Sequence, residues 1–325
     1  MASGVSIEIL DLRHFAASLL RPVLEAEGDL WMQRLHWDYH SSSRLLMQYL
    51  DNHMLPGYAA LDAGHVTGYT FCIYEDSKAV IGDVFAAASG GAAPSLQVEE
   101  TLLHHLLETL LNSPQIDRIE SQLLLHPEGA HAAIFRHNGF TVHPRLFMVK
   151  RLAGAAPALD ATPGSGLELR PWRSGDLNAA ARLICEAYSG HTDSLINDQY
   201  CTAHGSLRFL HNIVRYSGCG VFSGLASHVV EDHSTHQLAA LVLGSRVSPL
   251  SGHITQLCVH PDYRRRGLGR MLLRLTSSQF LSQGVSEVSL TVTAANVEAV
   301  ELYRSEGFGS AHTFDAAVWQ RGIQP

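Results

Sequence analysis

Apolar and polar residues alternate along the chain in two long stretches that predict the same order of elements. The first stretch begins with a strand and helical segments, followed by a three-strand meander, an amphipathic helix, a strand, a short helix and a final strand pair. Polar residues and a glycine separate the strands of the meander, as antiparallel turns require. The predicted bounds are 7–12, 19–24, 30–50, 58–61, 66–74, 79–88, 102–110, 116–125 and 130–137, with the last strand ending near residue 152.

The second stretch repeats this order after a segment without apolar periodicity. Residues 153–166, AGAAPALDATPGSG, are small and contain Pro and Gly, which is typical of a linker. We therefore predict two domains, 1–152 and 167–325, and each is long enough to form its own core. In the second we expect strands at 167–170, 220–230, 237–247 and 253–259, and helices at 179–188 and 207–216.

The stretch from 257 to 308 begins with a strand, a turn and a helix in the pattern of a phosphate-binding loop. An apolar strand ends in a turn, and a helix follows at once; the turn carries Arg264, Arg265, Arg266, Gly267, Leu268 and Gly269. Backbone N–H groups at the start of a helix point one way and attract phosphate. A side chain at either glycine would hold a ligand off these groups, and the turn calls for backbone angles that other residues resist. For this fragment alone, an ordinary tight turn with solvated charges is the alternative.

A second motif follows one strand later. Residues 296–308 have the order NxxAxxLYxxxGF, in which a short helix begins beside Asn296 and ends near Gly307. Together with VHPDYR at 259–264 and RxxGxG at 264–269, this motif resembles the acyl-CoA binding core of the GNAT superfamily of N-acyltransferases. The order of the two halves, separated by a helix and a strand, makes the resemblance specific.

The resemblance implies an α/β (α+β) fold of two similar domains, each a mixed, mostly antiparallel twisted sheet flanked by helices. It implies transfer of an acyl group from acetyl-CoA to a primary amine by direct attack within the C-terminal domain. Backbone N–H groups of the loop would hold the pyrophosphate, and a bulge or splay of the preceding strand would expose N–H groups to the pantetheine and the thioester carbonyl. The cofactor-binding residues so implied are Leu257, Cys258, Val259, Arg264, Arg265, Arg266, Gly267, Leu268, Gly269, Arg270 and Asn296.

Two residues of the second motif have both a functional and a structural interpretation. The resemblance places Tyr303 where a proton is donated to the leaving thiolate, and a phenol with a pKa near 10 can do this while neutral. Tyr303 is otherwise a core tyrosine on an amphipathic helix. Asn296 would contact the pantetheine arm or its surroundings, and it is also placed to cap the helix.

The sequence does not single out a general base. His253 begins the central strand and could accept a proton directly or through water, or it could be structural. Thr291 lies where some relatives carry a carboxylate, and threonine cannot serve as a base. Glu186, His191 and Asp193 follow the first helix of the second domain and are weaker candidates.

The N-terminal stretch repeats the second motif but lacks the loop chemistry. When residues 139–140 are aligned with the Gly-Phe pair at 307–308, Phe135 falls on Tyr303. The loop before the leucine-rich helix, SGGAAPSLQVEET, contains no arginine, and two glutamates, 99–100, lie where phosphate would need positive potential. We therefore expect a degenerate GNAT-like domain that lacks acyl-CoA binding and contributes to the acceptor pocket.

Composition narrows the class of protein. The chain has 325 residues, a net charge of −8 and no apolar run near the roughly 20 residues that a membrane helix needs. We expect a cytoplasmic protein that binds neither membrane nor nucleic acid and tolerates a cationic substrate. The five cysteines are widely spaced without a CxxC pair, which argues against disulfides and zinc, and we expect Cys258 to be a buried, inert thiol.

The 20 histidines include two pairs with helical spacing, His36 with His40 and His233 with His236. Neither pair has a third metal ligand nearby in sequence, so we expect no metal.

Two other functions fit the same motifs. The protein could bind acyl-CoA as a regulatory or sensor protein without turnover, or its N-terminal domain could serve mainly in dimerisation, giving a homodimer. The acceptor is equally open, since a small amine, an aminoglycoside-like molecule, a peptide N-terminus and a lysine all present a primary amine.

Overall fold

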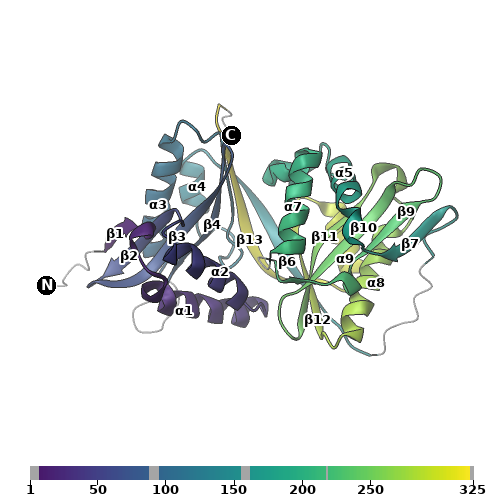
Figure 1. Cartoon of the computed structure of the whole chain (residues 1–325), viewed down its shortest axis with the longest axis horizontal. Helices are drawn as coiled ribbons and strands as arrows, with labels where there is room; N and C mark the ends of the chain where they lie inside the picture. Colours follow the sequence, from purple (N-terminus) through teal and green to yellow (C-terminus); the bar gives the residue numbers. More distant parts are fainter. Residues whose placement is uncertain (1–6, 88–94, 155–161, 217–218, 323–325) are drawn as a thin grey trace. The chain divides into compact units, whose positions relative to one another are not determined.

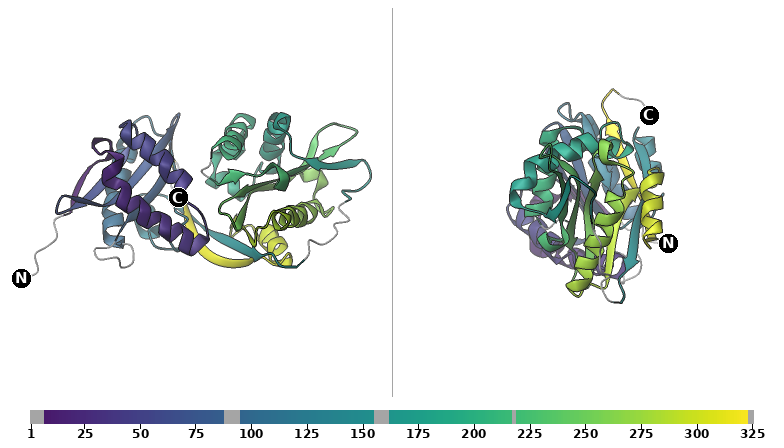
Figure 2. Two further views of the ribbon diagram at one scale, coloured as in Figure 1. Left: turned by 60° about the horizontal axis from the view of Figure 1, so that its bottom comes forward. Right: turned by 90° about the vertical axis from the view of Figure 1, so that its right-hand side faces the viewer.

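The computed structural model describes residues 7–87, 95–154, 162–216 and 219–322 of the chain. They form two compact units, seen in Figure 1 and from two further directions in Figure 2. Unit 1 comprises residues 1–144 and 314–325, and unit 2 comprises residues 145–313. Each unit has a mixed, mostly antiparallel sheet with helices on both faces, which confirms the expected α/β (α+β) fold class.

The sheet of unit 1 has the strand order β1-β2-β3-β4-β5-β13, in which only β4 and β5 are parallel neighbours among the described strands. Helices α1 and α2 pack on one face of this sheet, and α3 and α4 pack on the other. The elements are β1 (Glu8–Asp11), α1 (Ala17–Leu35), α2 (His40–Asp51), β2 (Gly57–Asp62), β3 (His65–Glu75), β4 (Lys78–Ala86), α3 (Leu96–Asn112), β5 (Arg118–Gln122), α4 (Ala132–His137) and the second half of β13 (Gly309–Gln320).

The sheet of unit 2 has the order β6-β12-β11-β10-β9-β7, with β11 and β12 parallel and β8 paired to β10. Helices α5, α6 and α7 lie on one face, and α8 and α9 lie on the other. The elements are β6 (Thr141–Arg151), β7 (Leu167–Pro171), α5 (Leu177–Ala187), α6 (Thr192–Ile196), α7 (Ala203–Arg215), β8 (Val221–Phe222), β9 (His228–Asp232), β10 (Leu238–Arg246), β11 (Ser251–Val259), α8 (Leu268–Ser282), β12 (Glu287–Thr293) and α9 (Val297–Ser305).

The two units exchange the last strands of their sequence stretches. Residues 145–151 of β6 pair with β12 in unit 2, and residues 316–320 of β13 pair with β5 in unit 1. The observed division therefore differs from the expected boundary at residue 152. The reason is physical, because an alternating apolar pattern shows which face of a strand is buried but not which sheet edge it joins.

Two predicted elements are each divided in the structure. The helical segment expected at 30–50 belongs to two helices, because α1 ends at His36, whose left-handed backbone (φ 52°) turns the chain before α2. The strand expected at 220–230 is split into β8 and β9 by a short 3₁₀ turn that begins at Gly224.

Two glycines position α8 against its sheet. Gly244 on β10 and Gly252 on β11 lie beneath the fully buried ring of Phe280, and a Cβ added at either glycine would come within 2.9 Å of that ring. This close approach fixes the height of α8 above β10 and β11, and hence of the loop that precedes it.

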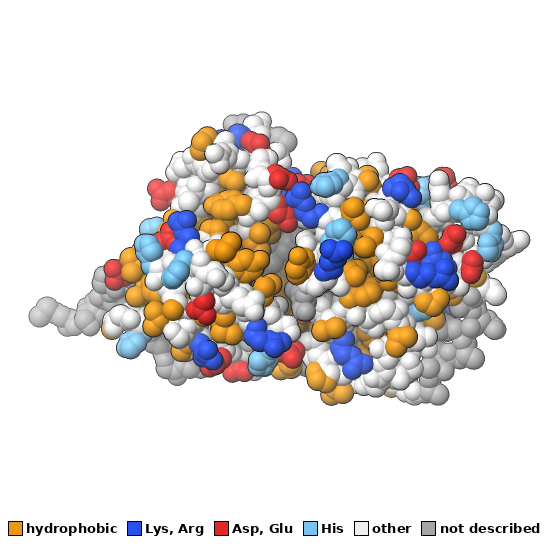
Figure 3. Space-filling model, viewed as in Figure 1, with side chains coloured by type: hydrophobic (Ala, Val, Ile, Leu, Met, Phe, Trp, Pro, Cys, Tyr) orange, Lys and Arg blue, Asp and Glu red, His pale blue; other side chains and the backbone are white. Residues whose placement is uncertain are grey.

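Charged side chains of both signs are mixed on the face of the molecule that Figure 3 shows. On the face shown in Figure 3, Lys and Arg side chains are interspersed with Asp, Glu and His rather than gathered in one stripe. No helix in the described part of the chain combines the length and apolarity that crossing a membrane requires.

Candidate functional site

The site in unit 2 begins where its two parallel strands separate. β11 is paired with β12 only from Ser251 to Ile254, whereas β12 continues to Thr293 beside β6 and β11 continues to Val259 beside β10. An extra residue on β11, Thr255, shifts the register with β10 at the same point. Beyond Ile254, one edge of β11 therefore has no partner among the described strands.

The direction of the backbone groups on this edge follows from the antiparallel ladder. The N–H of His260 donates to the carbonyl of Ala239 at 2.9 Å, and hydrogen-bonded and non-hydrogen-bonded pairs alternate along such a ladder. The backbone of Cys258 therefore points to β10, and the backbones of Leu257 and Val259 point into the gap. These N–H groups have no partner among the described strands, and the bulge lies at Thr255, before the expected position at 257–259.

The loop between β11 and α8 presents further N–H groups. Arg265 (φ 64°) and Gly267 (φ 80°) have left-handed backbones, and Gly267 directly precedes the helix. The N–H groups of residues 268–270 have no backbone or side-chain acceptor in the described part of the chain. Such unpaired groups at the positive end of a helix favour an anion. Gly269 is different from Gly267, because its φ is not positive and an added Cβ would make ordinary contacts at 3.5 Å or more.

Two arginine side chains hold the loop instead of extending from it. The Arg264 guanidinium donates from Nη2 to the carbonyl of Ala187 at 2.7 Å, which joins the loop to the end of α5. Arg266 donates to the carbonyl of Asp262 at 2.9 Å and lies over the ring of Tyr263. Both charges stay near the helix start while the side chains fix the path of the backbone.

The other two arginines differ in exposure. Arg265 is largely exposed, with a loose 3.9 Å contact to Glu298. Arg270 pairs with the buried carboxylate of Glu306 at 3.0 Å, and Arg274 on the next turn pairs with the same carboxylate at 2.7 Å. Glu306 therefore ties α8 to the end of α9, the helix that carries Tyr303.

Tyr303 is buried, with 9% of its surface exposed, and its hydroxyl has no hydrogen-bond partner among the described residues. Burial, followed by the negative charge of Asp193 and the thiol of Cys258, raises the pKa of Tyr303. The phenol is therefore neutral across the physiological range and keeps a proton to donate. The hydroxyl oxygen is not among the polar atoms sealed from solvent in the described chain, so a ligand can reach it although the ring is buried, which makes Tyr303 a functional candidate.

Asp193 is held close to Tyr303 by groups from two directions. One carboxylate oxygen accepts a hydrogen bond from the hydroxyl of Thr293 at the end of β12. The other lies 3.4 Å from Nδ1 of His191, and that nitrogen accepts the backbone N–H of Asp193. The carboxylate is thus oriented and mostly buried, with 13% of the side chain exposed. From the sequence alone Asp193 could not be preferred over Glu186, because the electrostatic effect of Asp193 on Tyr303 arises only in the fold.

Two stacked tyrosines form an apolar wall beside this carboxylate. Tyr188 stacks on Tyr200 with ring centroids 4.4 Å apart, and burial raises the pKa of both hydroxyls. Asp193 and Tyr303 also raise the pKa of Tyr188 electrostatically, which places these groups near one another in unit 2. Neither aromatic residue was a sequence candidate.

His253 does not suit the role of general base. It is buried, its Nδ1 is 2.9 Å from the hydroxyl of Ser289, and its ring stacks on Phe147. Burial, and then the positive charge of Arg145, lowers the pKa of His253 to about 3. An imidazole with this pKa is a poor proton acceptor at neutral pH.

The remaining sequence candidates lie as follows. Asn296 caps α9 by accepting the N–H of Ala299 at 3.3 Å. Cys258 is buried, and burial raises the pKa of its thiol, as expected for an inert cysteine. Glu186 is half exposed, with its carboxylate 3.4 Å from Nε2 of His260. Thr291 lies opposite Phe147 in the pairing of β12 with β6.

The corresponding region of unit 1 has different chemistry. Much of its loop, residues 88–94, lies outside the described residues. Glu99 in the first turn of α3 is buried, and its carboxylate faces His126 and His131. The histidine pair at 36 and 40, which was weighed as a metal site from the sequence, is separate from this group. His36 lies at the end of α1, and His40 is hydrogen-bonded to Asp38. Spacing in the sequence could not reveal Glu99, His126 and His131, because they come from three segments.

Comparison with known proteins supports the family resemblance in the C-terminal part. Residues 182–308 match the model of the acetyltransferase (GNAT) family. The ribosomal protein bS18 alanine N-acetyltransferase of Salmonella typhimurium is 46% identical over 55 residues, which are 17% of this chain and 37% of that protein. The mycothiol acetyltransferase of Geodermatophilus obscurus is 27% identical over 193 residues, 57% of this chain and 58% of that one. The chain thus aligns with less than two thirds of either relative.

Solved structures resemble the chain over nearly its whole length. A GCN5-related N-acetyltransferase from Sphaerobacter thermophilus gives a TM-score of 0.69 at 14% identity and covers 98% of both chains. A tandem GNAT protein from the clavulanic acid biosynthesis pathway gives 0.60 at 13% identity, covering 98% of this chain and 100% of that one. At these identities the likeness establishes the fold of both units. The match over residues 182–308 identifies that part of the chain as an acetyltransferase domain of the GNAT family.

Proposed function

We propose that unit 2 transfers an acetyl group from acetyl-CoA to a primary amine by direct attack, with Tyr303 as the proton donor. The observation that carries this proposal is the hydroxyl of buried Tyr303, which has no hydrogen-bond partner among the described residues and is influenced electrostatically by Asp193 and Cys258. Cys258 lies on β11 between Leu257 and Val259, whose N–H groups face the gap between the strands. A thioester bound in this gap would accept hydrogen bonds from these N–H groups at its carbonyl oxygen. The hydroxyl of Tyr303 would be the proton source for its sulfur.

Binding of the donor would use backbone groups more than side-chain charge. The N–H groups at the start of α8 suit the pyrophosphate, and Gly267 gives the turn the backbone angle that brings them together. Arg264, Arg265, Arg266 and Arg270 add positive potential around the helix start. Leu257 and Val259 offer N–H groups to the thioester, and Asn296 supports the helix that carries Tyr303.

The proton balance assigns a role to Asp193. The acceptor arrives as an ammonium ion and must lose one proton before its nitrogen can attack the carbonyl carbon. A buried carboxylate attracts that cation, and we assign Asp193 as the group that takes the proton and passes it to solvent. As the C–N bond forms, the N–H groups of β11 stabilise the oxyanion. The attacking nitrogen then gives its second proton to solvent. When the C–S bond breaks, the thiolate takes the proton of Tyr303, and solvent restores it. The products are the amide, free CoA and one proton.

The acceptor class follows from charge and from the relatives. A carboxylate flanked by stacked tyrosines suits a cationic amine with an apolar neighbour. One relative is named for an alanine of ribosomal protein bS18, and another for mycothiol. We therefore propose peptide N-termini and small aminoacyl amines as the first acceptors to test. Unit 1 would not bind acyl-CoA.

The decisive experiment is CoA release from acetyl-CoA in the presence of a panel of diverse amines. Release that depends on both the amine and the enzyme, with the acetylated amine found by mass spectrometry, supports turnover. Acetyl-CoA that binds at one site per chain without release above the uncatalysed rate with any amine would instead favour the sensor interpretation. Calorimetry on the same sample separates that outcome from a failure to bind the donor at all.

A further inference from the structure

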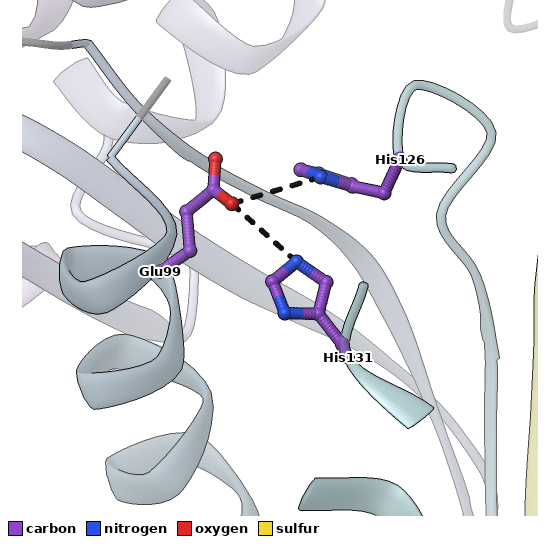
Figure 4. Close-up of side chains that lie close together, drawn as sticks. All are labelled: Glu99, His126 and His131. Atoms are coloured by element: carbon purple, nitrogen blue, oxygen red, sulfur yellow. Dashed lines mark ion pairs between the residues drawn. The ribbon is translucent and has the colours of Figure 1, made fainter. Parts of the chain in front are cut away.

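Three buried polar side chains meet in unit 1, away from the proposed acetyl-CoA site. Glu99 comes from the first turn of α3, His126 from the segment after β5, and His131 from the position just before α4. Their exposed fractions are 1%, 8% and 4%. One potential ligand atom from each lies within 4.8 Å of the others. Figure 4 shows the Glu99 carboxylate directed at both imidazole rings.

The distances suit ligands of one metal ion. Oε2 of Glu99 lies 3.6 Å from Nδ1 of His126 and 3.4 Å from Nε2 of His131. In a tetrahedral site with bonds of about 2.1 Å, neighbouring ligand atoms are about 3.4 Å apart. The carboxylate oxygen is thus spaced from each ring nitrogen as ligands around a common centre are, and the two ring nitrogens lie within 4.8 Å of each other.

The hydrogen bond of His126 to the backbone decides which of its ring nitrogens faces Glu99, and this arrangement favours a cation between the two side chains. Its Nε2 lies 2.8 Å from the carbonyl of Val84, and because a carbonyl only accepts, this nitrogen must carry the hydrogen. In the neutral ring Nδ1 then has a lone pair, and that lone pair faces the Glu99 carboxylate. Two acceptors face each other, and a cation converts the repulsion into attraction. A bond from the outer ring N–H to a carbonyl is also the usual support of a metal-bound histidine.

His131 supplies an independent observation. Both of its ring nitrogens are sealed from solvent, and neither has a hydrogen bond within the described part of the chain. Its 3.4 Å contact with Glu99 lacks hydrogen-bond geometry. A buried imidazole without partners is costly, and a metal bond at Nε2 removes much of that cost. The second oxygen of Glu99 accepts the N–H of Ala86 at 3.3 Å, which fixes the carboxylate for the same purpose.

We propose that Glu99, His126 and His131 bind one divalent transition-metal ion in unit 1, and that Zn²⁺ fits this donor set best. Two imidazole nitrogens and a carboxylate oxygen are ligands that Zn²⁺ accepts, with a water completing the tetrahedron. The ion would join α3, the segment after β5 and the start of α4. The expectation of a metal-free chain rested on histidine pairs that were close in sequence, whereas these ligands meet only in the fold.

The first test is metal binding by the full-length protein, stripped with a chelator and titrated with Zn²⁺ or Co²⁺. We expect one ion per chain, a visible absorption band typical of tetrahedral Co²⁺, and an unfolding temperature that rises with the Zn²⁺ concentration. A stripped, folded wild-type protein that binds neither ion, or that responds equally to Mg²⁺, overturns the proposal. This readout is independent of acetyl transfer.

The second test compares variants by Co²⁺ absorption and Zn²⁺ affinity. Glu99→Gln keeps the size of the side chain but removes its charge. We expect its Zn²⁺ affinity to fall by more than the roughly 10–100-fold that follows removal of an outer-shell partner. The matched control is His104→Gln, an exposed histidine on the same helix, and His40→Gln tests the exposed pair. If Glu99→Gln does not fold, His131→Gln replaces it. A Co²⁺ band that persists in both ligand variants, or that disappears in His40→Gln, contradicts the assignment.

Discussion

The first turns of α8 and α3 hold equivalent places in the two units, yet they are built for opposite partners. At α8, Gly267 opens the helix with a left-handed backbone, and the next N–H groups are left without acceptors in the described chain. At α3, the N–H groups of Val98 and Glu99 bond to the carbonyl of Ser95, and the Glu99 carboxylate is buried beside the helix start. One helix is ready for an external anion, whereas the other has an internal one.

The helices that follow differ by one oxygen atom at corresponding places. Tyr303 in α9 and Phe135 in α4 are both buried, and each ring packs against the phenylalanine of its Gly-Phe pair, Phe308 and Phe140. The packing is therefore shared, whereas the hydroxyl that we propose as the proton donor is not. The two units therefore share a fold but not the groups that we propose for acetyl transfer. The packing of the core is kept although the groups in the first turn of one helix and the hydroxyl on the next helix differ.

The largest expected effect comes from removing that oxygen in unit 2. Tyr303→Phe keeps the buried ring but removes the proton donor, and loss of general acid catalysis typically lowers a rate about 10²–10⁴-fold. Single-turnover transfer with a reactive amine measures the effect, and acetyl-CoA affinity should change far less. The reverse change, Phe135→Tyr, should create no activity. Wild-type rates for Tyr303→Phe at every pH would remove Tyr303 from the mechanism.

Asp193→Asn should have the next largest effect, a loss of about 10²-fold in kcat/KM near neutral pH. The amide keeps a hydrogen bond with Thr293 but cannot take a proton from the ammonium. The deficit should shrink as the pH rises, because more of the amine is then already neutral. Glu186→Gln, at a half-exposed carboxylate outside the Tyr303 contact, is the control. A pH-independent deficit would show that Asp193 acts only through structure.

A smaller effect is expected for donor binding at the loop. Gly267→Val forces a β-branched residue into a left-handed backbone, at a cost of roughly 1–2 kcal/mol, which corresponds to about a tenfold weaker affinity if the loop relaxes. Gly269→Ala meets only ordinary contacts and should bind acetyl-CoA nearly as well as wild type. Calorimetry should give one site per chain. A second site mapped to unit 1 would contradict the contrast between the two helix starts.

The smallest expected effect concerns the stability of unit 1 and its dependence on pH. Glu27 and Asp83 are buried together, and burial raises the pKa of both. A carboxyl with a raised pKa in the folded state costs nothing while protonated, and it destabilises the fold increasingly as the pH rises towards its folded pKa. Asp83→Asn removes one ionisation and keeps an acceptor for the N–H of Val84.

The difference in unfolding free energy between Asp83→Asn and wild type should therefore grow with pH in favour of the variant, to on the order of 1 kcal/mol. Urea unfolding at pH 5 and pH 9 measures it. Leu103→Met, a conservative core change without a titrating group, should give an offset that does not depend on pH. A variant that loses stability relative to wild type at high pH would mean that Asp83 is ionised and paired.

Local patterns in the sequence were enough to predict helices, strands and the glycine-containing loop before α8. The leucines of α3, the motif around Gly267 and the cap at Asn296 depend on neighbours within a few residues, and periodicity reports such interactions directly. The family resemblance followed from the same short motifs. Pattern could also place Tyr303 and Phe135 at equivalent positions, since both occur at a fixed distance from a Gly-Phe pair.

Which distant groups meet depends on the folded chain. Folding exchanges β6 and β13 between the units, places Asp193 where its charge acts on Tyr303, buries His253 and joins Glu99 to His126 and His131. Strand partners and buried clusters depend on contacts between segments far apart in the chain, and the energy of those contacts leaves no period in the sequence. Burial also sets the pKa values, so the same histidine that looked like a base at the start of a strand is a neutral core residue in the folded protein.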